Sequence, residues 1–304
     1  MKILLTGITG QVGWELQQTL MPLGKVIPTG RSASQVALQM DLAQPDTIRR
    51  TLREVKPAII VNAAAYTAVD KAELDANTAM AVNGIAPGII AEEAKSLGAA
   101  VIHYSTDYVF DGKKNTGYTE LDLPNPQNTY GETKLKGEQA IEAIGGSYLI
   151  LRTSWVYGLR GNNFLLTILR LAQEREELGV VNDQVGAPTW SRLIAEATAQ
   201  ILFQATKQSL SDFLANKSGI YHLSATGQAS WYSFAKAILE QERKFNPLKL
   251  QRLIAIASEQ YPTPAKRPAY SVLNNQKLFN TFGVTLPNWQ RTLQLLLAPE
   301  AIAS

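Results

Sequence analysis

A tyrosine and a lysine stand four residues apart in the segment Tyr130-Gly-Glu-Thr-Lys134. In a helix this spacing places both side chains on one face. A phenol has an ordinary pKa of about 10 and exchanges protons poorly at pH 7, but a neighbouring ammonium favours the phenolate and lowers that pKa. The pair therefore predicts a site of proton transfer in which Lys134 lowers the pKa of Tyr130.

The spacing alone is not specific, because Tyr232 and Lys236 repeat it later in the chain. The two pairs differ in context. Tyr130 follows residues 105–111, which come directly after an apolar strand pattern, whereas Tyr232 has no such strand end before it. We therefore expect Tyr130 to be catalytic and Tyr232 to pack. At the same strand end, the Thr106 hydroxyl is placed to donate to a substrate carbonyl; the alternative is that it only caps the strand.

Three glycines mark the first strand-to-helix turn. The apolar run of residues 3–5 predicts a strand buried on both faces, and a helical pattern begins by Val12. Between them, Gly7, Gly10 and Gly13 suit a tight turn, close approach of a phosphate, and close packing of helix on strand. No Gly-Lys-Ser/Thr follows, which argues against a mononucleotide P-loop. The segment predicts a dinucleotide whose pyrophosphate lies at the helix N-terminus.

These residues need a scaffold of alternating strands and helices, and the first half of the chain has that pattern. Strands are expected at residues 3–5, 26–27, 58–62, 100–105 and 148–152. Helices are expected at residues 12–20, 45–55, 77–97 and 129–144. Such alternation predicts an α/β fold with a doubly wound parallel sheet, a Rossmann fold, with ligands beyond the carboxyl ends of the strands.

After Gly158 the pattern is less regular. Helices are expected at residues 164–173, 191–203 and 288–297, and strands at 179–182 and 221–223, with an unstructured tail at the end. The strand at 221–223 is expected to return to the main sheet. We therefore predict a dinucleotide-binding domain at residues 1–158, with segments near 191–224 rejoining it. Residues 159–304 are mainly a smaller C-terminal substrate-binding subdomain.

Composition excludes several classes of function. The 304 residues carry a net charge of only +3, and the basic residues are scattered, so nucleic acid is not an expected partner. The absence of cysteine excludes disulfides, thiolate metal sites and a cysteine nucleophile, and two histidines make a histidine metal site unexpected. No stretch approaches the roughly 18 apolar residues of a membrane span, and the first apolar run is too short for a signal peptide. We expect a cytoplasmic protein with no membrane partner.

Together, the glycine motif and the Tyr130–Lys134 pair resemble the extended short-chain dehydrogenase/reductases. Within them, the chain is similar to the dTDP-4-dehydrorhamnose reductase family over nearly its whole length. The most specific segment is Ser105-Thr-Asp-Tyr-Val-Phe-Asp-Gly112. The other matching segments are residues 10–16, 62–70, 151–158, 181–189 and 267–271.

The resemblance implies reduction of the C4 keto group of a dTDP-linked 6-deoxysugar to give dTDP-L-rhamnose. Tyr130 would donate a proton to the C4 oxygen, Lys134 would hold the nicotinamide ribose, and Thr106 would stabilise the developing oxyanion. Asp107 and Trp155 match positions that contact the sugar, although Trp155 could instead be a core aromatic. Metal binding at a homodimer contact, with Mg²⁺, is implied by the family alone, and no ligands can be assigned.

Cofactor positions carry over in the same way. The matching residues are Gly7, Gly10, Gln11, Val12, Gly13, Asp41, Leu42, Ala65, Tyr66, Thr67, Tyr104, Tyr130 and Lys134. Where NAD-selective sites have an acid at the end of the second strand, this chain has Gly30-Arg31. A guanidinium suits a 2′-phosphate, so NADPH is expected to be preferred over NADH; the alternative is that Arg31 is a solvated loop residue.

Two other functions stay open at the level of sequence. One is a regulatory nucleotide-binding subunit, similar to the β subunit of methionine adenosyltransferase. The other is a nucleotide-sugar epimerase or dehydratase, although a dehydratase would need a carboxylate pair where only Asp107 is present. Arg267, in a proline-bounded loop of the second half, is expected to contact the substrate diphosphate.

Overall fold

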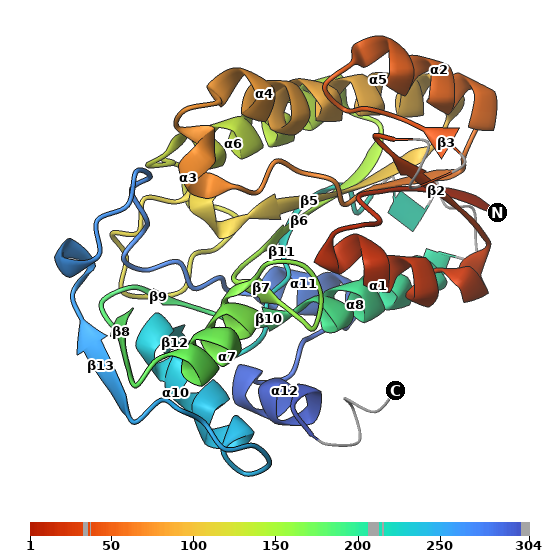
Figure 1. Cartoon of the computed structure of the whole chain (residues 1–304). Helices are drawn as coiled ribbons and strands as arrows, with labels where there is room; N and C mark the ends of the chain where they lie inside the picture. Colours follow the sequence, from red (N-terminus) through yellow and green to blue (C-terminus); the bar gives the residue numbers. More distant parts are fainter. Residues whose placement is uncertain (33–35, 37, 206–212, 215, 299–304) are drawn as a thin grey trace.

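The centre of the molecule is a parallel sheet. The computed structural model describes residues 1–32, 36, 38–205, 213–214 and 216–298. In this part of the chain the sheet has seven strands in the order β11-β6-β5-β4-β1-β2-β3 (Figure 1). The strands are β1 Lys2–Thr6, β2 Lys25–Gly30, β3 Leu38–Gln39, β4 Ile59–Asn62, β5 Ala100–Thr106, β6 Ser147–Thr153 and β11 Gly219–His222. Each neighbouring pair is parallel, so the predicted doubly wound fold is confirmed.

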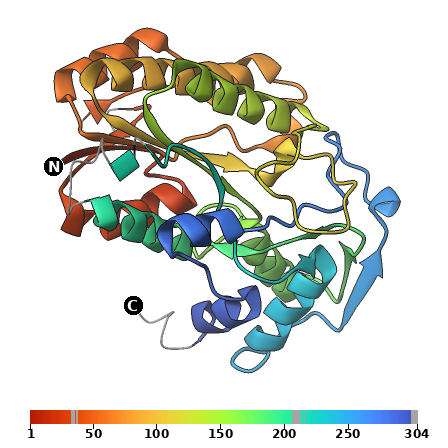
Figure 2. The same ribbon diagram turned by 180° about the vertical axis from the view of Figure 1, so that it is seen from behind.

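Helices cover both faces of this sheet, as Figures 1 and 2 show from opposite sides. On one face lie α2 (Pro45–Val55), α5 (Ala86–Leu97) and α6 (Thr129–Ile144), and on the other α1 (Gln11–Thr19) and α8 (Ser191–Ala205). Successive side chains of β1 point to opposite faces. Ile3 and Leu5 enter the core under α1 and α8, whereas Leu4 enters the core under α2 and α5. Burial on both faces explains the uninterrupted apolar run.

The helix expected at residues 77–97 is correct in position but wrong in regularity. Helical structure begins with α4 (Ala76–Met80), continues as a π-helical turn (Ala81–Ile85), and only then becomes α5. Pro87, in the first turn of α5, has no N–H to donate to the carbonyl of Asn83. The π-helical turn directly before α5 is wider than an α-helical turn, and it lies where this hydrogen bond is missing.

The chain after β6 builds a second, smaller core. It contains α7 (Phe164–Glu174), α10 (Trp231–Glu242) and α12 (Trp289–Leu296), with the parallel pair β8 (Glu177–Val181) and β13 (Arg252–Ile256). Short strands complete this region: β7 Val156–Tyr157, β9 Val185–Gly186, β10 Thr189–Trp190 and β12 Ala229–Ser230. The strand expected at 221–223 is β11, and it does join the main sheet beside β6.

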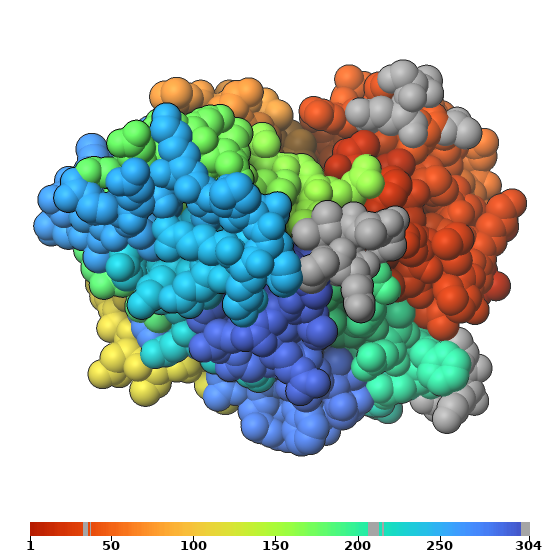
Figure 3. All heavy atoms as spheres, turned by 60° about the horizontal axis from the view of Figure 1, so that its bottom comes forward, coloured from red at the N-terminus to blue at the C-terminus, as the bar shows by residue number. Residues whose placement is uncertain are grey.

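Three further helical segments connect these elements: α3 Val69–Ala72, α11 Gln276–Phe282 and the 3-10 turn Asp107–Val109. Two other 3-10 turns span Met21–Leu23 and Ser258–Gln260. In Figure 3 the red N-terminal part and the cyan-to-blue C-terminal part occupy opposite sides, with green segments between them. Within the described residues, no helix has the length and apolar character needed to cross a membrane. The predicted tail falls mostly at residues 299–304, outside the described residues.

Candidate active site

A pocket of about 1380 Å³ opens at the carboxyl ends of the central strands. It lies where the strand order reverses, between β1 and β4, which is the usual ligand position in such sheets. Seventeen of the expected site residues line it. They are Gly7, Gly10, Gln11, Val12, Arg31, Asp41, Leu42, Ala65, Tyr66, Thr67, Tyr104, Thr106, Asp107, Tyr130, Lys134, Trp155 and Arg267.

Gly13 is the expected cofactor residue that does not line this pocket. A Cβ there would lie 2.0 Å from the carbonyl oxygen of Gly7, so Gly13 allows α1 to pack closely on the glycine turn. Gly7 itself has φ +72°, and a Cβ on it would lie 2.6 Å from the backbone of Ala63. Gly10 caps α1 without a side chain, which leaves the helix N-terminus open toward the pocket. These features fit a pyrophosphate.

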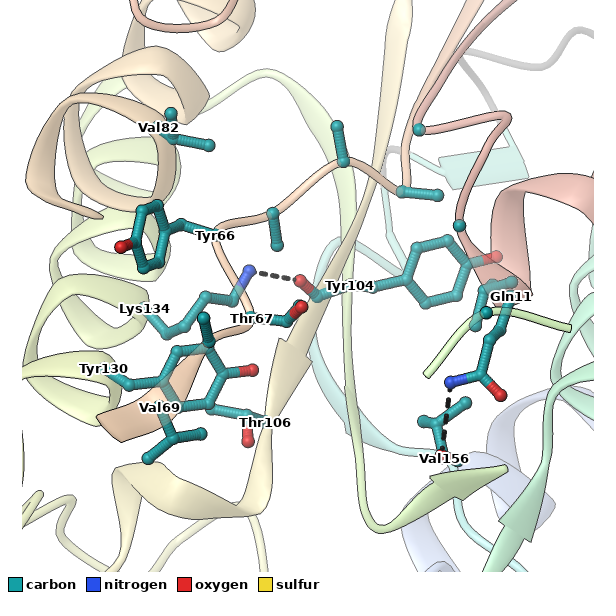
Figure 4. A pocket seen from close by; sticks show the side chains of 18 of the residues that line it. Gln11, Tyr66, Thr67, Val69, Val82, Tyr104, Thr106, Tyr130, Lys134 and Val156 are labelled. Carbon is teal, nitrogen blue, oxygen red and sulfur yellow. Dashed lines mark hydrogen bonds between the residues drawn. The ribbon is translucent and has the colours of Figure 1, made fainter. Parts of the chain in front are cut away.

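The wall opposite the glycine turn comes from the segment after β6. The Gln11 side chain donates to the Val156 carbonyl at 3.4 Å (Figure 4). It also accepts from the Asn163 amide at 3.0 Å. Asn163 also caps α7, accepting from Leu166 N–H at 3.1 Å. Asn163 was not among the expected site residues. Its local sequence signals only a helix cap, and its place in the pocket depends on tertiary packing.

On the other side of β1, Arg31 follows the end of β2 and is an exposed residue of the pocket lining.

Tyr66 belongs to the wall after β4, where its backbone N–H donates to the Asn83 side chain at 2.8 Å and its carbonyl accepts from the same amide at 3.0 Å. The π-helical turn that contains Asn83 therefore fixes the wall beside the expected dinucleotide.

Tyr130 and Thr106 meet at the base of the pocket. α6 begins just before Tyr130, capped by Asn128, which accepts from Gly131 N–H at 2.8 Å. Gly131 is required there, because a Cβ would lie 2.3 Å from the Tyr108 carbonyl oxygen. The Tyr130 hydroxyl lies beside Thr106, whose hydroxyl favours the ionised form of the phenol, and Figure 4 shows the two side chains side by side.

The expected lowering of the Tyr130 pKa by Lys134 is not what the structure shows. Burial raises the pKa of Tyr130 to about 12, and the hydrogen bond with Thr106 opposes that rise only in part. The Lys134 ammonium nitrogen, Nζ, is instead directed at β5. It donates to the Tyr104 carbonyl at 2.6 Å (Figure 4). It also lies 3.2 Å from His103 Nε2. A phenol with a raised pKa is protonated at pH 7, which is the form that can donate a proton.

Burial also acts on the neighbouring groups. It lowers the pKa of Lys134 to about 8, and the charge of Glu138 opposes this. Burial raises the pKa of Asp107 to about 6, although hydrogen bonds from Ser271, Ser154 and Thr106 favour its ionised form. Ser154 and Thr106 each donate to this carboxyl group at 3.1 Å.

Trp155 is a pocket aromatic rather than a core residue. Its backbone has φ +45°, which is unusual for a large side chain. Its indole stacks on Trp231 with 3.4 Å between ring centroids and an angle of 1°. Trp231 also lines the pocket, beside Phe164. Neither Trp231 nor Phe164 was expected, because each lies in the first turn of a helix in the irregular half, with no motif around it.

Arg267 lies in the pocket wall and pairs with Asp70, which also lines the pocket. Its Nη2 lies 2.8 Å from the Asp70 carboxylate, and Ala265 N–H donates to the same group at 3.2 Å. The guanidinium lowers the pKa of Asp70. The second tyrosine–lysine pair lies elsewhere: Tyr232 packs against the smaller core, and Lys236 lies 3.9 Å from Glu240. The packing role expected for Tyr232 is confirmed.

Metal ligation finds no support in this geometry. Across the residues that the structure describes, no group of three or more His, Cys, Asp or Glu side chains could hold a metal ion. The Mg²⁺ implied by the resemblance therefore has no ligand set here.

The pattern of the RmlD substrate binding domain family matches residues 1–302. A dTDP-4-dehydrorhamnose reductase of Burkholderia thailandensis is 48% identical over 298 residues, covering 97% of both chains. A protein of the same name from Escherichia coli is 46% identical over 298 residues, covering 98% of this chain and 97% of that one.

Solved structures agree. A dTDP-4-dehydrorhamnose reductase of Clostridium acetobutylicum superposes with a TM-score of 0.87 at 36% identity, covering 100% of both chains. The enzyme of that name from Bacillus anthracis, in complex with NADP, has a TM-score of 0.83 at 34% identity, covering 97% of this chain and 98% of that one. A UDP-glucose 4-epimerase of Thermus thermophilus shares the fold at 19% identity, with a TM-score of 0.80, covering 100% of this chain and 99% of that one.

Proposed function

This chain belongs to the RmlD substrate binding domain family, and we propose that it reduces the C4 keto group of dTDP-4-dehydro-L-rhamnose to give dTDP-L-rhamnose, with NADPH as the preferred reductant. The observation that carries the proposal is that Thr106, Tyr130 and Lys134 line one pocket, whose glycine turn and helix N-terminus fit a dinucleotide. Relatives that carry this activity in their names match the chain over almost its full length.

Bound NADPH would supply the hydride that reaches C4 of the sugar. Tyr130 supplies the proton that the C4 oxygen takes up as the carbonyl becomes a hydroxyl. The raised pKa keeps this phenol protonated until that moment. Thr106, beside Tyr130, donates a hydrogen bond to the oxygen as negative charge develops, an interaction whose loss costs ~3 kcal/mol in comparable sites.

Lys134 has two proposed roles. It holds the nicotinamide ribose, and its bond to the Tyr104 carbonyl at 2.6 Å keeps the ammonium nitrogen at the end of β5, beside the pocket. Asp107 and Trp155 would contact the sugar, and Arg267 its diphosphate; all three line the pocket. We assign the dinucleotide to residues 1–158 together with the segments near 191–224, and the substrate mainly to the rest of residues 159–304.

Two alternatives make different predictions. A regulatory subunit would bind nucleotide without turnover; the occurrence of Thr106, Tyr130 and Lys134 in one pocket favours the reductase over it. An epimerase would return the hydride to the sugar and consume no NADPH overall. The epimerase neighbours are under 25% identical and share only the fold.

The test is turnover of dTDP-4-dehydro-L-rhamnose, generated in situ, followed by loss of NADPH absorbance and by identification of the product. Wild type is expected to form dTDP-L-rhamnose. Tyr130→Phe, which keeps the ring and removes the proton, should lower kcat by about 10²–10⁴-fold. Tyr232→Phe is the matched control, since that phenol packs outside the pocket, and its kcat should stay within about twofold of wild type. A folded wild type that binds nucleotide without turnover would contradict the proposal.

A further inference from the structure

Three polar side chains form a row across the middle of the sheet. Thr6 ends β1, Asn62 ends β4, and His103 lies in β5. Thr6 is the register partner of Asn62, and Asn62 is the register partner of His103. All three side chains are buried, with exposed fractions of 2%, 1% and 1%. Buried polar groups of this kind are costly unless they are hydrogen-bonded.

The row is connected by hydrogen bonds and ends at the lysine of the proposed site. Thr6 Oγ1 donates to Asn62 Oδ1 at 2.7 Å, and Asn62 Nδ2 lies 3.0 Å from His103 Nδ1. On the other side of the imidazole ring, Nε2 lies 3.2 Å from Lys134 Nζ. Thr6 and Lys134 both line the pocket, so the row connects its cofactor side to its proton-donor side.

The direction of each bond follows from what each atom can donate. Thr6 Oγ1 accepts from the backbone N–H of Ala64 at 3.0 Å and gives its own hydrogen to Asn62 Oδ1. The Asn62 amide nitrogen therefore faces His103, and it can only donate. A neutral imidazole that accepts at Nδ1 carries its proton on Nε2. That N–H points at Lys134 Nζ, which can accept it only as an uncharged amine.

An ammonium at Lys134 requires the reverse arrangement. Nζ then has hydrogens but no lone pair, so His103 must accept at Nε2 and carry its proton on Nδ1. The Asn62 amide must turn over to present its oxygen to Nδ1, and the hydroxyl hydrogen of Thr6 loses its acceptor. One proton is taken up overall, from solvent, and the imidazole stays neutral in both arrangements.

We propose that His103 is a positioning residue that alternates between donating to and accepting from Lys134 Nζ, so that the row Thr6–Asn62–His103 selects the amine or the ammonium form of the lysine. The inference rests on the proposed role of Lys134 beside Tyr130. The row thereby controls whether Lys134, which lines the pocket beside the proposed nicotinamide ribose position, carries a positive charge.

The other groups around Lys134 do not provide this control. The titratable groups that line the pocket with Lys134 include Tyr130 on α6, Asp107 after β5, Tyr66 after β4 and Tyr104 on β5. Behind them, the charge of Glu138 on α6 raises the lysine pKa, and Glu138 pairs with Arg152 on β6. Glu138, one turn along the helix from the lysine, is held by Arg152 through bonds of 2.9 and 2.6 Å between buried side chains. Its charge is thus already paired.

The pKa directions agree with the geometry. Burial lowers the pKa of Lys134 to about 8, so both its forms are populated near neutral pH. Burial, with the charge of Lys134, holds the pKa of His103 well below its usual range, so the ring stays neutral while the lysine titrates.

Histidine tautomers can be observed directly in this protein. The chain has two histidines, so long-range ¹H–¹⁵N correlation spectra of the full-length, ¹⁵N-histidine-labelled protein contain two ring systems. His103 is expected to carry its proton on Nε2 at high pH and on Nδ1 at low pH, with a midpoint near pH 8. His222 is an internal reference, because its Nδ1 lies 3.0 Å from the Tyr118 carbonyl and must donate at every pH.

Two variants make the test decisive. Lys134→Met should abolish the tautomer change. Thr6→Val removes the hydrogen that orients the Asn62 amide and should raise the midpoint by about 0.5–1 pH unit. Thr29→Val is the matched control: Thr29 is also buried at the end of a neighbouring strand, but it donates to the Leu5 carbonyl at 3.2 Å and not to the row. Its midpoint should equal that of wild type.

A single His103 tautomer from pH 6 to pH 10, or a change that persists in Lys134→Met, would overturn the inference. These spectra need neither substrate nor turnover, so the two proposals can fail separately. A wild type without reductase activity that still shows the coupled change would refute the proposed reaction and leave the row intact. Turnover that depends on Tyr130, together with a fixed His103 tautomer, would support the proposed reaction and refute the role of the row.

Discussion

Tyr130, Lys134 and Asp107 share a buried position at the base of the pocket. In each of them burial is the largest cause of the pKa shift, and each shift favours the uncharged form. The raised pKa of Tyr130 suits the proposed proton transfer, because it keeps the phenol protonated at neutral pH and available as a donor. The same burial makes the ionised form of Asp107 unfavourable, which lowers the free energy of unfolding when that carboxyl group is ionised.

Asp107→Asn should therefore stabilise the fold above pH 6. The pKa of Asp107 is raised from 3.8 to about 6, so the folded state binds more protons than the unfolded state between about pH 4 and 6. Stability falls as pH rises through that window, and the penalty, about 3 kcal/mol at most, is complete above it. Urea unfolding at pH 8 should show Asp107→Asn more stable than wild type by about 1–3 kcal/mol, with no difference at pH 3.5. If Asp107→Asn and wild type had the same free energy of unfolding at pH 8 as well as at pH 3.5, ionised Asp107 would not destabilise the fold.

Arg31 is the residue that we expect to decide between cofactors. It follows β2, lines the pocket, and stands where an acid would bind a ribose 2′-hydroxyl. Arg31→Ala should lower kcat/KM with NADPH by about tenfold, the loss of one charge-assisted contact, and change kcat/KM with NADH little. Equal kcat/KM values for the two cofactors in wild type would contradict this assignment. Arg50→Ala, on the α2 helix and outside the pocket lining, serves as the control.

At the scale of elements, α6 places the proposed proton donor. Its N-terminal cap, Asn128, is buried and has two partners: it accepts from Gly131 N–H at 2.8 Å and donates to the Lys266 carbonyl at 2.7 Å. One side chain thus joins the start of α6 to the loop that carries Arg267. The position of Tyr130 and that of the loop are set together.

Asn128→Ala should lower both stability and activity. Loss of the cap and of the bond to Lys266 is expected to reduce the free energy of unfolding by about 1–3 kcal/mol, measured in urea. KM for the sugar nucleotide should rise and kcat should fall, because both α6 and the Arg267 loop lose a support. Asn288→Ala removes the similar cap of α12, where Asn288 accepts from Gln290 N–H at 2.9 Å outside the pocket lining. It should cost about 1 kcal/mol and leave both kinetic constants unchanged. Similar kinetics in the two variants would show that α6 needs no cap to place Tyr130.

At the scale of the molecule, the pocket is lined by residues of both the nucleotide half and the C-terminal part, and polar contacts join the two across it. Asp70, from α3, and Arg267, from the C-terminal part, are 197 positions apart and form one of these contacts. Gln11 and Asn163 form another. All four residues line the pocket, so each pair joins the nucleotide half to the C-terminal part at the proposed binding site.

Arg267→Ala should act mainly on substrate affinity. KM for the dTDP-sugar is expected to rise by about tenfold or more, with a smaller change in kcat, if the guanidinium contacts the diphosphate. Stability should fall as well, by about 1–3 kcal/mol, because the Arg267 side chain is only 22% exposed and also donates to the Ala265 carbonyl. Arg252→Ala removes a surface pair with Glu177 and is the control. An unchanged KM in Arg267→Ala would refute the diphosphate assignment.

The sequence by itself determined the main strands and helices of the nucleotide half and seventeen of the residues that line the pocket. Apolar runs, glycine spacing and helical periodicity are local properties, and each acts within one turn or one strand, so α2 and α6 appear at the predicted residues. The return of β11 to the main sheet was also readable, from a short apolar strand pattern. The Tyr130–Lys134 pair was placed correctly in the pocket for the same reason.

Only the tertiary structure decided which distant side chains meet and which proton states they hold. Trp231 reaches Trp155, and Asp70 reaches Arg267, through packing that no local pattern encodes. The raised pKa of Tyr130 depends on how much of the chain excludes water around it, whereas the sequence showed only a lysine one helical turn away. Local sequence fixes the order and type of the elements, but burial and long-range contact are properties of the complete fold, and they set the chemistry of this pocket.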